Sequence, residues 1–217
     1  MVGQPVTQRL EVTMNDQQEQ TLTSDLDDGG LSEEAIASMA GDVAESVRFF
    51  LGALEEAAQG ALAGQAVSVL LLQVSQLLLS GARLGAMEDV VPSGKFEPDA
   101  GYEPDLEHVR EGLAALLAPV DDYQLIFDPL EIEPEILPSR LSDDLTAVAA
   151  DVMHGLQHYE DARPKEALWW WQFSYLDSWG GIAAAALRAL QSVVGHARLD
   201  DAGVLDLTSD EATIHTA

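Results

Sequence analysis

One group of side chains in the sequence could bind a metal ion: Asp151, His154 and His158. Spacings of three and four residues place all three on one face of a helix. A carboxylate and two imidazoles form a reasonable partial site for Zn²⁺ or another divalent cation. Further ligands would have to come from elsewhere in the chain, where the candidates are Asp161, Glu107 and His108. The competing interpretation is that both histidines are solvated or interact with the dipole of their helix near its C-terminus.

The aromatic side chains point to a core and to a second candidate site, for binding rather than catalysis. All four tryptophans lie within residues 167–181. A buried aromatic side chain removes about 150–250 Å² from water, so most of these rings are expected in the core. One edge of the cluster could instead line a binding groove. The candidate groove residues are Trp170, Trp171, Tyr175, Trp179, Tyr123 and Asp128, although an aspartate before proline usually caps a turn.

The sequence lacks the motifs of several common enzyme classes. None of Ser139, Ser142 and Ser174 has the G-x-S-x-G context of a nucleophilic hydrolase. There is no phosphate-binding loop and no dinucleotide fingerprint. An enzymatic function is therefore the less favoured interpretation, and no cofactor is expected apart from the divalent metal considered above.

The tryptophan segment predicts a long, central helix. Pro164 is well placed at its first position, and the pattern continues to about His196. The pair Gly180-Gly181 indicates either the close approach of another helix or a kink. Residues 165–197 are therefore expected to form one kinked helix or two.

Apolar residues at intervals of three and four predict four further helices. Three of these helices are expected over residues 32–60, 61–84 and 104–118, and the fourth starts at residue 142 and has Tyr159 on its buried side, with Ser32 and Ser142 as N-caps. Residues 123–129 could be a turn of helix or a short extended segment, and residues 131–138, with two prolines, a rigid loop. The sequence has no convincing strand alternation. The predicted fold is an all-α bundle of five or six helices around the Trp-rich helix.

The predicted helix over residues 61–84 raises the question of a membrane span, because no charged residue occurs from Ala57 to Ala82. Glutamines and serines interrupt its apolar run, and no basic cluster or aromatic belt flanks it. A soluble helix that is buried on most sides is therefore predicted. If it is not fully covered, its open face would bind a partner.

The charge balance limits the classes of partner. The chain has 38 acidic and 10 basic residues and a net charge of −28. This charge argues against binding to nucleic acids or anionic membranes and favours basic partners and cations. The absence of cysteine excludes disulfides, and the N-terminus lacks the features of a signal peptide. A cytoplasmic protein is therefore expected.

The two ends of the chain differ from its middle. Residues 1–31 are polar and acidic and are predicted to form a disordered arm. Residues 32–198 are predicted to form a single helical domain, and residues 199–217 a flexible acidic tail.

Three motifs, in this order, resemble those of a known bacterial family. They are Tyr123-x-x-x-Phe127-Asp128-Pro129, then Asp143-Asp144-Leu145 leading through Asp151 to Gly155-Leu156-x-x-Tyr159, then Trp169-x-Trp171-x-Phe173 leading to Trp179-Gly180 and Ala186-Leu187-x-Ala189-Leu190. With them, residues 36–194 resemble DUF5063, a domain of unknown function that is common in actinobacteria. The resemblance implies an all-helical cytoplasmic protein without an established activity. The sequence departs from the family pattern where Glu, Arg, His and His are replaced by Trp170, Gln172, Ser178 and Ile182, which weakens an enzymatic interpretation.

Together, these observations favour a helical protein-interaction module. Its partner would be a protein, basic or helical, that docks in a groove beside the helix over residues 61–84 or beside the tryptophan cluster. A first alternative is a metal-dependent enzyme that uses Asp151, His154 and His158. A second is a homo-oligomer, such as a homodimer, formed through the uncharged helix.

Overall fold

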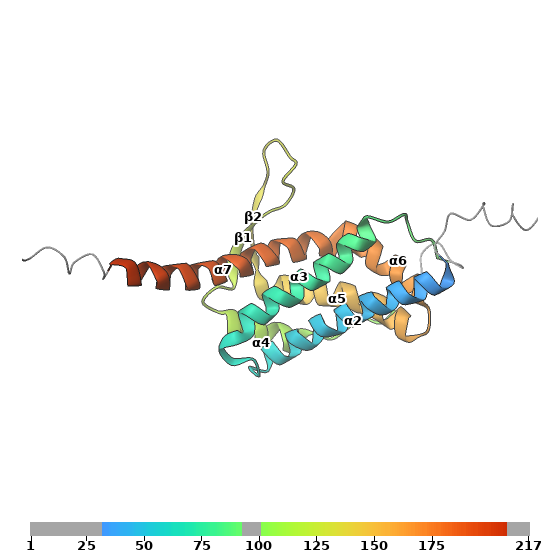
Figure 1. Cartoon of the computed structure of the whole chain (residues 1–217), viewed down its shortest axis with the longest axis horizontal. Coiled ribbons are helices and arrows are strands. Elements are labelled where there is room, and N and C mark those ends of the chain that lie inside the picture. The colour runs from blue at the N-terminus through green and yellow to red at the C-terminus, as the bar shows by residue number, and fades with distance from the viewer. Residues whose placement is uncertain (1–31, 93–100, 208–217) are drawn as a thin grey trace, which may run out of the picture. The chain divides into compact units, whose positions relative to one another are not determined.

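Figure 1 shows a computed structural model that describes residues 32–92 and 101–207, with side chains as far as residue 199. The described chain is predominantly helical, which confirms the predicted fold class. Its elements are α2 (Glu33–Ala58), η1 (Ala63–Gln65), α3 (Ala66–Gly85), α4 (Glu107–Leu117), β1 (Asp122–Ile126), β2 (Ile136–Arg140), α5 (Leu141–Glu160), α6 (Pro164–Ser174), η2 (Tyr175–Trp179) and α7 (Gly180–Leu207). The predicted N-terminal arm and the last ten residues lie outside the described residues.

Helix α2 ends at Ala58, two residues before the end predicted from the sequence. The backbone of Gly60 has a φ of 73°, in the left-handed region that favours glycine. Its N–H donates to the carbonyl of Ala57 at 3.0 Å, and the N–H of Ala61 donates to the carbonyl of Glu56 at 2.9 Å. This pair of bonds satisfies carbonyls of the last helical turn and stops the helix.

Helix α5 begins one residue before the predicted N-cap, so the assignment of Ser142 to that position is wrong. The N-cap residue is Arg140, and its side chain makes no capping hydrogen bond. Instead, Asp121 accepts hydrogen bonds from the backbone N–H of Ser142 at 2.8 Å and from its hydroxyl at 2.9 Å. A carboxylate that precedes the hairpin thus satisfies one of the free N–H groups of the helix start.

The tryptophan segment forms a continuous helical run rather than two separate helices. Helix α6 starts at Pro164, as predicted, and passes into η2, a π-helical turn. Helix α7 follows directly at Gly180 and extends to Leu207, beyond the end predicted near His196. The chain therefore passes the Gly180-Gly181 pair without a break, and the irregularity lies in the turn before it.

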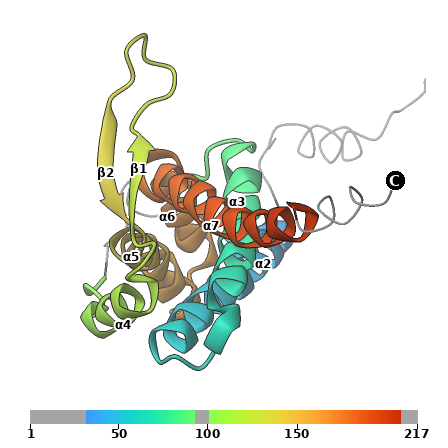
Figure 2. The same ribbon diagram turned by 90° about the vertical axis from the view of Figure 1, so that its left-hand side faces the viewer.

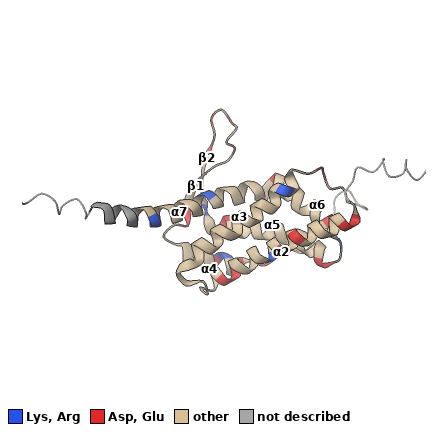
Figure 3. Ribbon diagram, in the orientation of Figure 1, with Lys and Arg blue, Asp and Glu red and all other residues tan. Residues whose placement is uncertain are grey.

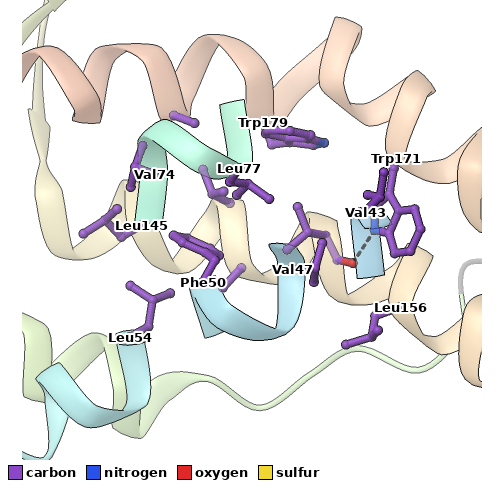
Figure 4. Packing of buried hydrophobic residues seen from close by; sticks show 14 of the residues in the cluster. Val43, Val47, Phe50, Leu54, Val74, Leu77, Leu145, Leu156, Trp171 and Trp179 are labelled. Carbon is purple, nitrogen blue, oxygen red and sulfur yellow. Dashed lines mark hydrogen bonds between the residues drawn. The ribbon is translucent and has the colours of Figure 1, made fainter. Parts of the chain in front are cut away.

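The core lies where α2, α3, α5, α6 and α7 meet. Figure 4 shows Trp171 and Trp179 pointing into it. Their side chains are 0% and 1% exposed. Phe50 of α2 and Leu77 of α3 are buried among the same side chains. The indole N–H of Trp171 donates to the carbonyl of Val152 at 2.8 Å, which satisfies its polar group inside the core.

Helix α3 is covered on one face only, so the expectation of burial on most sides is wrong. Its buried face carries Leu70, Val74 and Leu77, whereas Leu72 and Leu79 on the other side are 53% and 56% exposed. In the described residues, Ala63–Gly85 is the one helical stretch long and apolar enough to cross a membrane, judged by length and composition alone. Helix α3 therefore has the exposed apolar face that the sequence analysis considered as an alternative to full burial.

The segment between α4 and α5 is a β-hairpin, which the sequence analysis did not predict. Strand β1 pairs antiparallel with β2, in a register that runs from Asp122 opposite Arg140 to Ile126 opposite Ile136. Of the predicted rigid loop, residues 131–135 connect the strands, but residues 136–138 belong to β2. Figure 2 shows that β1 is the strand on the α7 side, and the elements in contact are β1 with α7 and β2 with α5.

Candidate functional site

The base of the hairpin is fastened to α5 by a polar network around Asp144. The hydroxyl of Tyr123 donates to Asp144 Oδ2 at 2.5 Å, and the hydroxyl of Ser139 donates to the same oxygen at 2.8 Å. Burial, followed by the neighbouring Asp144 carboxylate, raises the pKa of Tyr123 well above its ordinary value. The phenol therefore stays protonated and keeps its donor, which fixes β1 and β2 to one helix.

A second link reaches the hairpin from the buried Asp121. Besides capping α5, this carboxylate lies 2.7 Å from a guanidinium nitrogen of Arg140, at the end of β2. Asp121 is only 3% exposed, so a charge-assisted contact at this distance holds the strand firmly. The two networks together set the angle at which the hairpin leaves the helices.

Between the hairpin and α7 lies a groove of about 770 Å³. One wall is formed by Pro119, Val120, Pro129 and the stretch from Asp122 to Phe127, which includes all of β1. The other is formed by α7 residues on one side of the helix: Gly181, Ala184, Ala185, Arg188, Ala189, Ser192, Val193 and His196. No residue of β2 lines it, so the groove is bounded by the edge of β1 that is not paired within the described chain.

The residues that line the groove are mostly apolar, with a few polar groups among them. Glycine and alanine dominate the α7 wall, so the backbone of a bound segment can approach this helix closely. Arg188 and His196 supply the basic groups and Asp122 the acidic one. Basic residues are few in this protein, as the blue positions in Figure 3 indicate, and Arg188 is one of the ten. Such a site suits an apolar segment that carries an acidic group.

The tip of the hairpin exposes large apolar side chains. Phe127, Leu130 and Ile132 are 74%, 92% and 99% exposed. Apart from Pro134, residues 130–136 alternate between apolar and acidic side chains, and the acidic residues are Glu131, Glu133 and Glu135. Apolar side chains gathered on a projecting segment are typical of a surface that binds another macromolecule.

Two of the predicted groove residues, Trp171 and Trp179, are core residues and cannot line a surface groove. Tyr123 does line the groove. Tyr175 packs instead on α3, where a Cβ added at Gly81 would lie 2.4 Å from its ring. Asp128 accepts a hydrogen bond from the N–H of Leu130 at 2.9 Å, which is the turn-capping role.

The structure does not bring the three predicted metal ligands together as a site. Asp151 accepts a hydrogen bond from the hydroxyl of Ser178 at 2.6 Å, and burial raises its pKa. The rings of His154 and His158 lie 5.8 and 6.0 Å from the ring of Trp170, and His158 Nδ1 lies 3.3 Å from Glu166 Oε2. Among the described residues, no group of three or more His, Cys, Asp or Glu side chains could hold a metal ion.

The other proposed ligands have partners of their own. His108 lies 3.1 Å from Glu55, Glu107 pairs with Arg110, and Asp161 lies 2.8 Å from Arg163. The geometry therefore offers no support to a metal-dependent mechanism on α5.

The four residues at which the sequence analysis finds departures from the family pattern all make structural contacts, and Ile182 packs against the core. Trp170 stacks on His158 with an angle of 14° between the rings, and Ser178 bonds to Asp151. Gln172 is 4% exposed, accepts from the N–H of Val90 at 2.7 Å and donates to the carbonyl of Leu84 at 2.9 Å. These contacts hold α5, α6 and η2 and the loop after α3 together.

Sequence reasoning found one wall of the groove at Tyr123 and missed the other. The α7 wall is marked by Gly181, Ala184, Ala185 and Ala189, small residues at helical spacing. The same run of alanines also supplies buried positions such as Ala183 and Ala186, so its exposed side could not be distinguished from its core side. The alternation in residues 130–136 falls almost entirely on the connection between the two strands, so it did not mark the hairpin either.

The comparisons with known proteins identify a family but no activity. No curated protein matches the chain significantly. A crystal structure of a protein from Bacteroides fragilis has a similar fold, with a TM-score of 0.55 and 22% sequence identity, over 70% of this chain and 89% of that one. The model of the domain of unknown function DUF5063 matches residues 34–196. The chain therefore belongs to the DUF5063 family.

Proposed function

We propose that this chain is a protein-interaction module that binds an extended segment of a protein in the groove between the hairpin and α7. The observation that carries this proposal is the edge of β1 that no strand among the described residues pairs with and that borders an apolar groove. An exposed strand edge offers backbone hydrogen bonds to an added strand, and a groove beside it selects the side chains of that strand.

The hydrogen-bond pattern of the hairpin supports this proposal. The N–H of Phe127 donates to the carbonyl of Glu135 at 3.1 Å, which makes this a hydrogen-bonded pair. Because such pairs alternate along an antiparallel ladder, the backbone groups of Asp122, Gln124 and Ile126 point away from β2. These three residues present donors and acceptors to an incoming strand.

The groove also favours a particular chemistry in its ligand. The net charge of the whole chain attracts basic surfaces, as the sequence analysis expects, but the groove itself holds Arg188 and His196. A segment with apolar side chains toward α7 and carboxylates toward these two groups would fit it best. The ligand segment itself should therefore be apolar and acidic.

A fluorescein-labelled peptide of alternating isoleucine and glutamate residues is a direct probe of this groove. The protein for this titration is the full chain with Leu130→Ser and Ile132→Ser, which removes two exposed apolar side chains of the tip but changes no residue of the groove. We expect the fluorescence anisotropy of the peptide to rise as this protein is added. Ala184→Trp places a large ring in the groove, so the peptide can no longer contact the α7 wall. This variant should weaken binding by more than about tenfold.

The matched control is Ala197→Trp, an exposed position on the same helix that does not line the groove. It should leave the affinity unchanged. Binding that is equally strong in both tryptophan variants, or no binding of the peptide at all, would refute the groove as the docking site. A peptide with lysine in place of glutamate should bind more weakly because of Arg188.

A further inference from the structure

We propose that the segment that occupies this groove is the hairpin of a second copy of the chain, in a dimer with two-fold symmetry. This proposal rests on the docking groove proposed above and names its occupant. In the dimer, β1 pairs antiparallel with β1 of the other copy, and the tip of each hairpin lies on α7 of the other copy. The two hairpins then form one four-stranded sheet.

The edge of β1 is self-complementary. An antiparallel pair of identical strands obeys two-fold symmetry, and centring it on Gln124 places Asp122 opposite Ile126 of the other copy. The backbone groups that point away from β2 belong to these same three residues, so all of them gain partners. β1 contains a single charged residue, Asp122, and has no lysine or proline of the kind that normally protects an edge from pairing.

The antiparallel arrangement also determines where each tip goes. A strand that runs opposite to β1 carries its own loop past the base of the first hairpin, and α7 lies at that base. The exposed apolar tip, formed by Phe127, Leu130 and Ile132, would thus be covered by the apolar residues of the groove. In this dimer, the groove of each copy is filled and the tip of each copy is covered, and the two β1 edges pair with each other.

The charges agree locally with this occupant. Glu131, Glu133 and Glu135 alternate with the apolar side chains of the tip, and the groove of the other copy holds Arg188 and His196. The net charge of −28 repels two whole copies, so screening by salt should help them to approach. The dimer should therefore be weak at low ionic strength and stronger near physiological salt, where the Debye length is about 8 Å.

Sedimentation velocity of the full chain over a wide range of concentrations tests the proposal. We expect a monomer–dimer equilibrium at physiological salt. Leu130→Ser with Ile132→Ser, and separately Arg188→Glu, should each weaken the dimer by more than about tenfold. Gln124→Pro removes a backbone donor that points away from β2 and should also abolish the dimer while the hairpin persists.

The controls separate this interface from the alternative one on α3. Leu72→Ser with Leu79→Ser alters two exposed side chains of α3 and should leave the dimer intact. Arg188→Glu combined with Glu131→Arg and Glu133→Arg restores opposite charges and should recover dimerisation. A dimer that survives the tip and Arg188 variants but is lost in the α3 variant would overturn the proposal.

Failure of this proposal can be distinguished from failure of the docking groove. If the unmodified chain is a monomer at all concentrations and salt levels, the second copy is not the occupant. Binding of the isoleucine–glutamate peptide to the tip variant would then still establish the groove as a docking site for another protein. If the peptide fails to bind and the chain is also a monomer, both proposals are wrong.

Discussion

Asp151 is a partly buried carboxylate of α5 that affects stability through its pKa. Burial raises its pKa, and this effect outweighs the hydrogen bond from Ser178 and the attraction of His154, which lower it. Asp177 and Glu103 add like-charge repulsion in the same direction as burial. The ionised carboxylate is therefore less stable in the folded state than in the unfolded chain.

We expect Asp151→Asn to stabilise the protein at neutral pH. Because the folded-state pKa lies above the ordinary value of 3.8, the folded state binds more protons between these two values. The ionised carboxylate thus lowers the free energy of unfolding by its full amount above the folded-state pKa, and this loss of stability disappears below 3.8. Urea denaturation of both proteins at several pH values measures the difference, which should shrink as the pH falls.

Asp42→Asn, at an exposed position of α2, is the control for the loss of one negative charge. It should change stability much less than Asp151→Asn. A stability gain for Asp151→Asn that persists unchanged at acidic pH would show that burial of the charge is not its cause.

At this scale, residue type predicted burial better than it predicted partners. The large aromatic area of the tryptophans favoured the core, which is where Trp171 lies, whereas its alternative assignment to a groove is wrong. The partners of polar residues could not be predicted in the same way. Asp121 and Ser142 are 21 residues apart, and only the fold brings the carboxylate to the start of α5.

Among the elements, the turn after α5 contains a local strain that the sequence did not indicate. Ala162 has a φ of 58°, and its neighbours complete the same capping pattern that Gly60 completes after α2. The N–H of Arg163 donates to the carbonyl of His158 at 3.0 Å, and that of Ala162 to Tyr159 at 3.1 Å. An alanine thus occupies a left-handed position that glycine adopts without a steric penalty.

Ala162→Gly should therefore stabilise the protein, by about 0.5–1 kcal/mol once the greater freedom of glycine in the unfolded chain is deducted. Thermal unfolding followed by circular dichroism measures the change. The reciprocal substitution, Gly60→Ala, should be destabilising for the same reason. A lower melting temperature for Ala162→Gly would mean that unfolded-state entropy outweighs the strain.

The helices were predictable from spacing and the hairpin was not, for a physical reason. Each of the predicted helices buries a stripe of apolar residues, which leaves a period in the sequence. The hairpin buries only a few residues, and its two strands, of five residues each, contain only half-buried and exposed positions. Pro138 within β2 also imitates a loop, although proline is tolerated in an edge strand.

At the scale of the whole molecule, the charge is strongly unbalanced. The ion pairs of the described residues use several of the ten basic residues, among them Arg110, Arg140 and Arg163. With 38 acidic and 10 basic residues, the chain carries 28 negative charges that no positive charge of its own neutralises. Folding brings these charges closer together, so their repulsion opposes the compact state.

Added sodium chloride should therefore raise the melting temperature of the protein at neutral pH. Screening shortens the Debye length from about 30 Å at 0.01 M to about 10 Å at 0.1 M, which removes long-range repulsion before it affects close ion pairs. Differential scanning calorimetry at the two salt concentrations measures the effect. Near the sequence pI of 4.1 the net charge is small, so the same salt change should have little influence there. A melting temperature that falls with salt at neutral pH would contradict this account.

The π-helical turn over Tyr175–Trp179 has a consequence for how this fold can vary. Such a turn contains one residue more than an α-helical turn, so it acts as a single-residue insertion in the run from α6 to α7. An α-helix rotates by about 100° per residue, and this extra residue therefore sets the rotational phase of everything after it. A chain one residue shorter here would keep the tryptophan core of α6 and yet turn a different side of α7, without Arg188, toward the hairpin. The position of the groove thus depends on the length of this short segment as much as on the side chains that line it.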